Sequence, residues 1–282
     1  MFRLSVWAAA ALAAATAGAF AQQQSLVERG GYLVNGIGVC GNCHSPRGGD
    51  PKSFAGGTNV FNTPAYTVKG PNLTPHPEAG LGQWSDDDIK RALVEGKRPN
   101  GHQLAPNMPY PLYGVLTERD KDAIVAYLRS LPTNPTKVDP PVYKAEFKVS
   151  PFPPAAKPMT EADLADPVKR GLYLAAVGHC AACHSKLTES GDMDYGPTGL
   201  GAGGRRFGGA QGATAANITP HPTKGIGGWT DAEIKAMLVS GKSRDGRELK
   251  PPMVEFAPFY ATMTDADLSA IVAWMRSLPP IE

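Results

Sequence analysis

The sequence has little net charge, no long apolar run beyond its first residues and almost no pattern typical of β-strands. Lysine and arginine number 28 against 26 aspartate and glutamate, so nothing predicts a nucleic-acid-binding surface or a polybasic membrane patch. No stretch after residues 6–18 is long and apolar enough to cross a membrane, and we expect membrane association only through a partner. Because strand patterns are nearly absent, the expected fold class is all-α.

No cysteine lies outside two copies of Cys-x-x-Cys-His, at Cys40-Gly-Asn-Cys43-His44 and Cys180-Ala-Ala-Cys183-His184. This spacing is the attachment signature of c-type haem. On a helical turn each thiol can add to one haem vinyl group, and the next residue is placed under the iron. A zinc site would need the two pairs combined into one four-ligand set, while a redox dithiol or a structural disulfide would use the cysteines without the histidine. We predict two covalently bound haem c groups, with His44 and His184 as proximal iron ligands.

The N-terminus has the pattern of an export signal. Arg3 precedes the apolar run of residues 6–18, and Ala19-Phe20-Ala21 resembles a small-residue cleavage site. We therefore expect residues 1–21 to be a signal peptide and the location to be periplasmic, which agrees with haem attachment outside the cytoplasm. An uncleaved N-terminal anchor is the alternative.

The remaining chain is a duplication. Matching segments recur in the same order: Asn72–Pro77 with Asn217–Pro222, Trp84 with Trp229, and Met108 with Met253. Between the repeats, residues 132–158 contain eight prolines, which favours a stiff, extended linker. We expect one domain over residues 22–135, a proline-rich linker over 136–160 and a second domain over 161–282.

Each repeat predicts three or four helices joined by long loops. The expected helices span about 25–43, 85–96 and 117–130 in the first repeat, and about 166–183, 230–241 and 264–277 in the second. The middle helices begin with capping signals at Ser85 and Thr230 and end near glycines. Gly31 and Gly171 are expected where the first and last helices pack closely.

An electron-carrying haem commonly has a methionine thioether opposite its histidine, which raises its potential. Met108 is the only methionine between residues 2 and 158, and its proline-rich loop could hold the sulfur rigidly. In the second repeat, alignment with Met108 favours Met253. The expected iron ligands are thus His44 with Met108, and His184 with Met253.

Several residues compete for these roles. His76 and His221 also align and are rival ligands, although loop positions near the haem edge are favoured. Met237, Met263 and Met275 are expected in the core. His179, directly before Cys180, is expected to face solvent.

The chain resembles class I cytochromes c, and most of all the dihaem and multihaem cytochrome c subunits of bacterial alcohol, gluconate and aldehyde dehydrogenases. The residues that carry the resemblance are the two haem motifs, the N-[LI]-T-P-H-P and G-x-G-x-W-[ST]-D segments, the methionine loops and the final [YW]-[LM]-R-S-L-P. The resemblance implies that Trp84 and Trp229 direct indole N–H groups at haem propionates, and that Asn72 and Asn217 border the same edge.

These features predict an electron-transfer protein rather than an enzyme, because two closed irons leave no site for substrate. The implied donor is a dehydrogenase, and the implied acceptor is an oxidase, a quinone-linked protein or another cytochrome. A dihaem cytochrome c peroxidase is the enzyme alternative, and a haem-based sensor is a third. Because Glu255 follows Met253 closely, the second haem is expected to have the lower potential.

Overall fold

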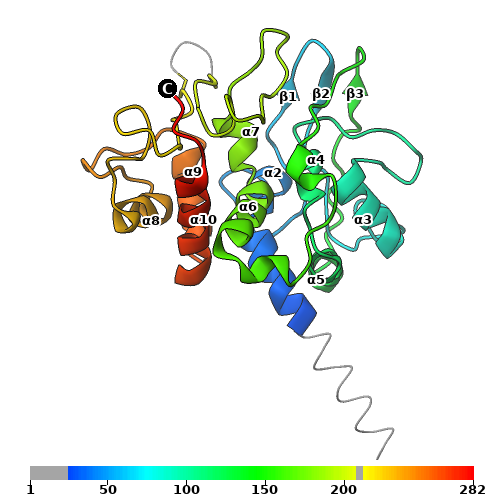
Figure 1. Cartoon of the computed structure of the whole chain (residues 1–282). Helices are drawn as coiled ribbons and strands as arrows, with labels where there is room; N and C mark the ends of the chain where they lie inside the picture. The colour runs from blue at the N-terminus through cyan, green and yellow to red at the C-terminus, as the bar shows by residue number, and fades with distance from the viewer. Residues whose placement is uncertain (1–24, 208–211) are drawn as a thin grey trace, which may run out of the picture.

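The computed structural model describes residues 25–207 and 212–282, so the expected signal peptide lies outside the described residues. Its helices occur in the same order in both halves of the chain (Figure 1). The first half has a helix over residues 25–35, then α2 (Cys40–His44), α3 (Asp86–Glu95), α4 (Tyr110–Tyr113) and α5 (Glu118–Ser130). The second half has α6 (Pro167–Val177), α7 (Cys180–His184), α8 (Asp231–Ser240), α9 (Met253–Tyr260) and α10 (Asp265–Ser277). In the described part of the chain, no helix is long and apolar enough to span a membrane.

The middle helices follow from their end residues. In α3 the Ser85 side chain accepts a hydrogen bond from the Asp88 amide, and the Asp88 carboxylate accepts one from the Ser85 amide. Thr230 and Glu233 form the same capping box at the start of α8. Glycines in the left-handed region end both helices, where a residue with a Cβ would be strained. Both helices lie where the sequence predicted them.

The first helix of each repeat is shorter than predicted, because it breaks before the haem motif. The helix over residues 25–35 is followed by a turn, and Val39 has a φ of 43° before α2 begins. Likewise α6 ends at Val177, and His179 has a φ of 52° before α7. This break lets each Cys-x-x-Cys-His segment form a separate short helix with its own direction.

The first and last helices of each repeat cross at a glycine. A Cβ added at Gly30 would lie 1.9 Å from the Ala123 carbonyl oxygen, and one added at Gly171 would lie 2.0 Å from that of Ala270. Only a residue without a side chain allows this approach. The expectation that Gly31 lies at this close contact is confirmed, since a Cβ there would be 3.0 Å from the Tyr127 ring of α5, but the tightest approach in the first repeat is at Gly30.

A small antiparallel sheet is the exception to the all-helical expectation. Strands β1 (Phe61–Asn62), β2 (Tyr66–Val68) and β3 (Val142–Tyr143) pair in that order, with Tyr66 opposite Tyr143. Strand β3 belongs to the expected linker. Two-residue and three-residue strands are too short to show an alternating pattern, which explains why the sequence did not predict them.

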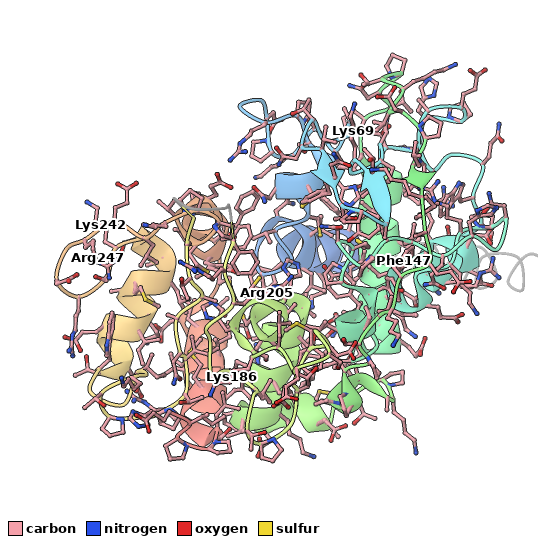
Figure 2. The ribbon with its side chains drawn as sticks, turned by 90° about the horizontal axis from the view of Figure 1, so that it is seen from above. Lys69, Phe147, Lys186, Arg205, Lys242 and Arg247 are labelled. Carbon is pink, nitrogen blue, oxygen red and sulfur yellow. The ribbon has the colours of Figure 1, made fainter. Side chains whose placement is uncertain are left out.

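The proline-rich segment is packed against both repeats. Phe147 contacts Tyr143 and Tyr66 of the sheet, with ring centroids 5.8 and 5.5 Å apart. Further along, the buried ring of Phe152 meets Tyr195 of the second repeat at 4.9 Å. In Figure 2 Phe147 lies on the side of the first repeat, and the labelled lysines and arginines are spread over the molecule. The segment thus connects the two repeats through side-chain contacts as well as through the chain.

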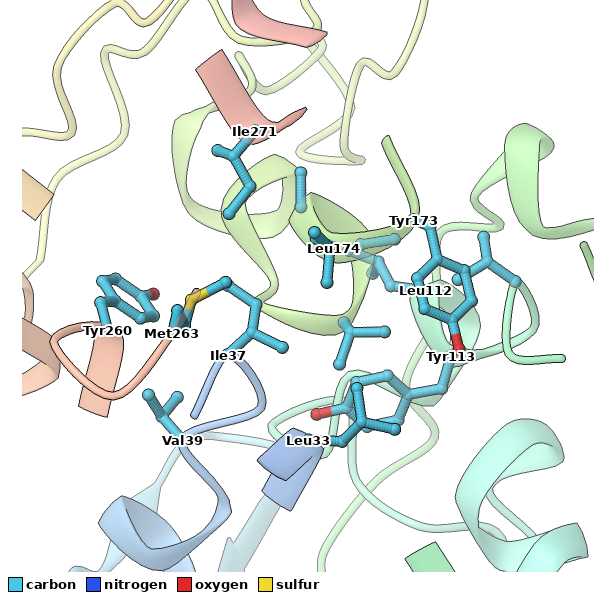
Figure 3. Close-up of a cluster of buried hydrophobic side chains, with 14 of the residues drawn as sticks. Leu33, Ile37, Val39, Leu112, Tyr113, Tyr173, Leu174, Tyr260, Met263 and Ile271 are labelled. Atoms are coloured by element: carbon cyan, nitrogen blue, oxygen red, sulfur yellow. The ribbon is translucent and has the colours of Figure 1, made fainter. Parts of the chain in front are cut away.

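The two repeats share one hydrophobic core. Buried side chains of both form a single cluster, part of which is drawn in Figure 3. Its labelled members are Leu33, Ile37, Val39, Leu112 and Tyr113 from the first repeat, and Tyr173, Leu174, Tyr260, Met263 and Ile271 from the second. Buried apolar side chains of both repeats are therefore in contact across the interface between them.

Candidate haem sites

The histidines of the two haem motifs are arranged as metal ligands. His44 and His184 are buried, and their Nδ1 atoms lie 2.9 Å from the Pro71 carbonyl oxygen and 2.7 Å from that of Ala216. A carbonyl can only accept, so Nδ1 carries the proton and Nε2 presents its lone pair. Burial lowers the pKa of both imidazoles and thereby keeps them neutral. Each ring is thus fixed in the tautomer that an iron ligand requires.

None of the four cysteines forms a disulfide. Burial raises the pKa of Cys40 and Cys180 to about 12, and it also raises the pKa of Cys43 and Cys183. Before haem attachment, all four thiols are therefore protonated at neutral pH. Addition of a thiol to a vinyl group forms one S–C bond and transfers the proton to the other vinyl carbon, so it needs no oxidant. Two such pairs, each followed by an oriented histidine, fit two haem c groups.

Met108 and Met253 occupy matching places in the two repeats. Both are half-buried and pack against the shared core. The Met108 amide donates to the Ala105 carbonyl at 3.0 Å, two residues before α4, and the Met253 amide donates to the Lys250 carbonyl at 3.1 Å at the start of α9. Backbone hydrogen bonds thus hold both methionines in turns. Ligation by either sulfur stays a prediction.

The competing methionines have other roles. Met263 and Met275 are buried within the hydrophobic core, which confirms their expected placement. The Met193 sulfur accepts a hydrogen bond from Nη1 of Arg205 at 3.6 Å. Met237 lies half-buried on α8.

His76 and His221 act as acceptors in their own loops. The Nδ1 atom of His76 accepts hydrogen bonds from the amides of Glu78 and Ala79, at 3.3 and 3.1 Å. His221 makes the same pair of bonds to Thr223 and Lys224. An Nδ1 acceptor leaves the proton on Nε2, which is the tautomer opposite to that of His44. The geometry therefore favours loop closure over iron ligation for both.

The side-chain amides of Asn72 and Asn217 connect the Asn-x-Thr-Pro-His-Pro loop of each repeat to the end of that repeat by hydrogen bonds. Nδ2 of Asn72 donates to the carbonyls of Asn134 and Thr136, and its Oδ1 accepts from the amide and hydroxyl of Thr74. Asn217 uses its Oδ1 on Thr219 in the same way and donates to the Ile281 carbonyl at 2.6 Å. All hydrogen-bonding capacity of the Asn72 side chain is therefore used within the protein.

The two tryptophans are half-buried against the core, and neither indole N–H has a protein acceptor among the described residues. Their backbone carbonyls accept hydrogen bonds from the last helices: Arg129 donates to Trp84, and Arg276 donates to Trp229. The same arginines bond to the carbonyls of Leu81 and Ile226 at 2.9 and 3.0 Å. Sequence reasoning missed this role, although the repeated Arg-Ser-Leu-Pro was visible.

One further cation was not anticipated. The Nε atom of Arg98, in the loop between α3 and Met108, is buried without a hydrogen-bond partner. Within the described part of the chain, no carboxylate forms a salt bridge with its guanidinium. A buried unpaired donor of this kind suits a carboxylate ligand.

The expectation for His179 is wrong, and the charge expected beside Met253 has a partner in the other repeat. His179 does not face solvent: it is half-buried, its ring lies 6.1 Å from that of Tyr113, and burial lowers its pKa to about 4. Glu255 is not an isolated charge beside Met253. It forms a salt bridge with Arg47 of the first repeat, and its charge adds to the effect of burial in raising the pKa of Cys43 there. The expected lower potential of the second haem thus loses its basis.

Comparison with known proteins connects this geometry to a family. The family model described as cytochrome c matches residues 27–132 and 168–279. The chain is 31% identical over 274 residues to the gluconate 2-dehydrogenase cytochrome c subunit of Pantoea cypripedii, a match over 90% of this chain and 60% of the relative. It is 32% identical over 274 residues to the cytochrome c subunit of the quinone alcohol dehydrogenase of Komagataeibacter europaeus, covering 91% and 57%.

A third relative is nearer in length. The "diheme cytochrome c-type" protein of Cereibacter sphaeroides is 27% identical over 270 residues, covering 89% of this chain and 86% of the relative. The chain spans about 60% of the two dehydrogenase subunits. None of the three relatives is named as a peroxidase, so the peroxidase hypothesis gains no support. The gluconate and alcohol types of the expected resemblance are confirmed, and the chain belongs to the cytochrome c family, with two covalently bound haem c groups.

Proposed function

We propose that this chain is the periplasmic electron-transfer partner of a dehydrogenase and passes the electrons on to a respiratory acceptor. Support comes from the named relatives, which are cytochrome c subunits of gluconate and alcohol dehydrogenases, and from the export pattern of residues 1–21. The acceptor is an oxidase, a quinone-linked protein or another cytochrome.

The observation that carries the proposal is the matched pair of methionine turns. Met108 and Met253 are held half-buried by equivalent backbone hydrogen bonds, each in the repeat of one oriented histidine. We assign His44 and Met108 to the first iron, and His184 and Met253 to the second. When bound, the haems supply one-electron redox chemistry. The chain would supply the iron ligands, burial and a rigid surround, and two protein ligands for each iron would leave no position for a substrate.

Unpaired donors on the first repeat suit the haem carboxylates. The indole N–H of Trp84 and the guanidinium Nε of Arg98 are free of protein acceptors among the described residues. We assign both groups to the propionates of the first haem, and the indole N–H of Trp229 to those of the second. Arg244, whose guanidinium lies 5.1 Å from the centre of the Trp229 ring, holds that indole in place.

Optical spectra of the ferric holoprotein test the ligand assignment. Methionine ligation produces a weak long-wavelength charge-transfer band, and we expect Met108→Ala and Met253→Ala each to remove about half of it. Met193→Ala is the matched control, since its sulfur is already bonded to Arg205, and it should leave the band unchanged. Loss of the band in Met263→Ala but not in Met253→Ala would show that the second ligand is misassigned.

The peroxidase hypothesis is tested on the same sample. Closed coordination predicts low-spin iron at both sites and no turnover of hydrogen peroxide by the isolated protein. A haem that becomes high-spin on partial reduction, together with rapid peroxide reduction, would overturn the proposed function. Reduction of the holoprotein by a periplasmic dehydrogenase fraction, followed by reoxidation by membranes, would support it.

A further inference from the structure

Two buried carboxylates at the contact between the repeats each bind groups from both repeats. Asp120, near the start of α5, accepts a hydrogen bond from the Tyr173 hydroxyl at 2.5 Å, although Tyr173 belongs to α6 of the other repeat. Asp267, near the start of α10, accepts one from the Tyr32 hydroxyl at 2.5 Å. The two bonds run in opposite directions across the interface.

An arginine of the same repeat completes each arrangement. Arg29 donates two bonds to Asp120, at 2.8 and 2.7 Å, and Arg170 bonds to Asp267 at 2.6 Å through Nε. The side chains of Asp120 and Asp267 are 3% and 2% exposed. Hydrogen bonds to buried charged groups are among the strongest in proteins. Each carboxylate is thus a fixed, fully desolvated anchor.

The two anchors are equivalent by the internal repeat. Tyr32 and Tyr173 each follow an arginine by three residues, and Asp120 and Asp267 each follow a capping threonine by three. The interface therefore has approximate two-fold symmetry, like the interface of a homodimer. We refer to the six residues Arg29, Tyr32, Asp120, Arg170, Tyr173 and Asp267 as the tyrosine–aspartate latch.

The same interface brings the two haem-attachment segments together. The Cβ position at Gly178, two residues before Cys180, lies only 2.7 Å from Cδ1 of Ile37, three residues before Cys40. The next residue, His179, faces the ring of Tyr113. Because each haem is attached through the cysteine that follows its turn, the interface sets how the haems face each other.

Hydrophobic contacts alone do not fix this arrangement. The shared core of Figure 3 is apolar, and apolar packing is largely non-directional. The tyrosine–aspartate bonds are directional, and they lie at two separate points of the interface. Two such points limit rotation of one repeat against the other to the axis that joins them, and the packed apolar contacts oppose that remaining rotation.

We infer that Tyr32 and Tyr173 are positioning residues, whose bonds to Asp267 and Asp120 fix the two haem domains in one orientation and so set the rate of electron exchange between the haems. The inference rests on the proposed electron-transfer function. We expect electrons to pass between the haems at the facing turns of residues 36–40 and 176–180.

The test uses holoprotein that carries Tyr32→Phe, Tyr173→Phe or both substitutions. Each substitution removes only one hydroxyl group. The matched control is Tyr127→Phe, because the Tyr127 hydroxyl accepts its bond from Asn35 within the first repeat, at 2.8 Å. We expect each latch variant to raise the unfolding equilibrium constant about tenfold or more. This effect alone would also follow from a purely structural role.

Two further measurements separate positioning from stability. The distribution of distances between the two ferric irons, from their magnetic dipolar coupling, should broaden in the double variant and stay sharp in Tyr127→Phe. The exchange rate between the haems of half-reduced protein should fall severalfold, while the absorption spectrum of each haem is unchanged. An unchanged iron–iron distance and exchange rate in the double variant would overturn the inference.

The iron–iron distance also keeps this inference separate from the proposed function. If the protein turned over peroxide, the proposed function would fail, yet a broadened distance would still support the latch. If the double variant or Tyr173→Phe does not take up haem, Tyr32→Phe alone carries the test, because Tyr32 is only half-buried.

Discussion

Single residues around the haem motifs differ between the repeats, and His179 is the clearest case. Its counterpart by alignment in the first repeat is Val39, and both have positive φ before the first haem cysteine. Burial depresses the pKa of His179 to about 4, while a hydrogen bond to the backbone of Gly38 partly opposes this shift. The folded protein thus keeps an uncharged imidazole against Tyr113, at a position where the first repeat has valine.

This burial predicts a loss of stability in mild acid. Below pH 6.5 the unfolded chain binds a proton at His179 that the folded protein does not bind until about pH 4. The imidazole therefore destabilises the fold increasingly as the pH falls through this window, by up to about 3 kcal/mol. His179→Val should flatten the pH dependence of the unfolding free energy between pH 7 and 4. Equal slopes for the two proteins would contradict the burial of a neutral His179.

Asn72 offers a second test at the residue scale, because its hydrogen bonds predict a structural role whereas the family resemblance places it at the haem edge. Asn72→Ala would leave the buried amide of Thr74 without its acceptor and remove the bonds donated to the Asn134 and Thr136 carbonyls, and should cost about 2–4 kcal/mol of unfolding free energy. Asn100→Ala, which removes a single exposed bond to the His102 amide, is the control and should cost little. A shifted haem potential with unchanged stability would instead favour the propionate-edge role.

Among the secondary-structure elements, those with local signals were predicted and those set by distant contacts were not. Each capping box of α3 and α8 is formed by residues within four positions of the sequence, and these helices begin where expected. The breaks at Val39 and His179 have no such signal, because positive φ is uncommon for any residue other than glycine and is most strained for a β-branched residue such as valine. Helix α4, β3 and the bond from Tyr32 to Asp267 depend on partners far along the chain.

The crossing of the first and last helices gives a prediction for whole elements. Gly30→Ala and Gly171→Ala would place a methyl group about 2 Å from a backbone carbonyl oxygen of α5 or α10. Each should force the helices apart and cost about 3 kcal/mol or more. Gly49→Ala is the control, because a Cβ at this position in a surface turn would lie 3.3 Å from its nearest neighbour, the Pro46 carbonyl oxygen. Denaturant unfolding measures the difference, and similar values for Gly30→Ala and Gly49→Ala would argue against the close crossing.

At the scale of the whole molecule, the two repeats behave as one unit in packing and in charge. Their buried residues form one core, and the proline-rich segment contacts both. The sequence predicts two domains and a linker, but spacing along the chain contains no information about contacts between the repeats. Charge is shared in the same way: Glu255 of the second repeat pairs with Arg47, three residues after His44.

This pair predicts which haem responds to a change of charge. Arg47→Gln leaves the Glu255 carboxylate unpaired beside Cys43, and negative charge stabilises ferric iron, so the potential of the first haem should fall. One charge at about 10 Å with an effective dielectric of about 20 is worth about 1.7 kcal/mol, or about 70 mV. Arg47 is largely exposed, and screening should reduce the shift to a few tens of millivolts.

Redox titration measures the shift. Titration in a Met108→His background identifies the haem whose potential changes, because the potential of the first haem should there be well below that of the second. Glu255→Gln should raise the potential of the first haem, and the double variant with Arg47→Gln should nearly restore it, because the pair is then removed as a whole. If Glu255→Gln instead changes only the potential of the second haem, the charge acts within its own repeat, through the turn at Met253. The predicted effect of Glu255 on the first haem would then be wrong.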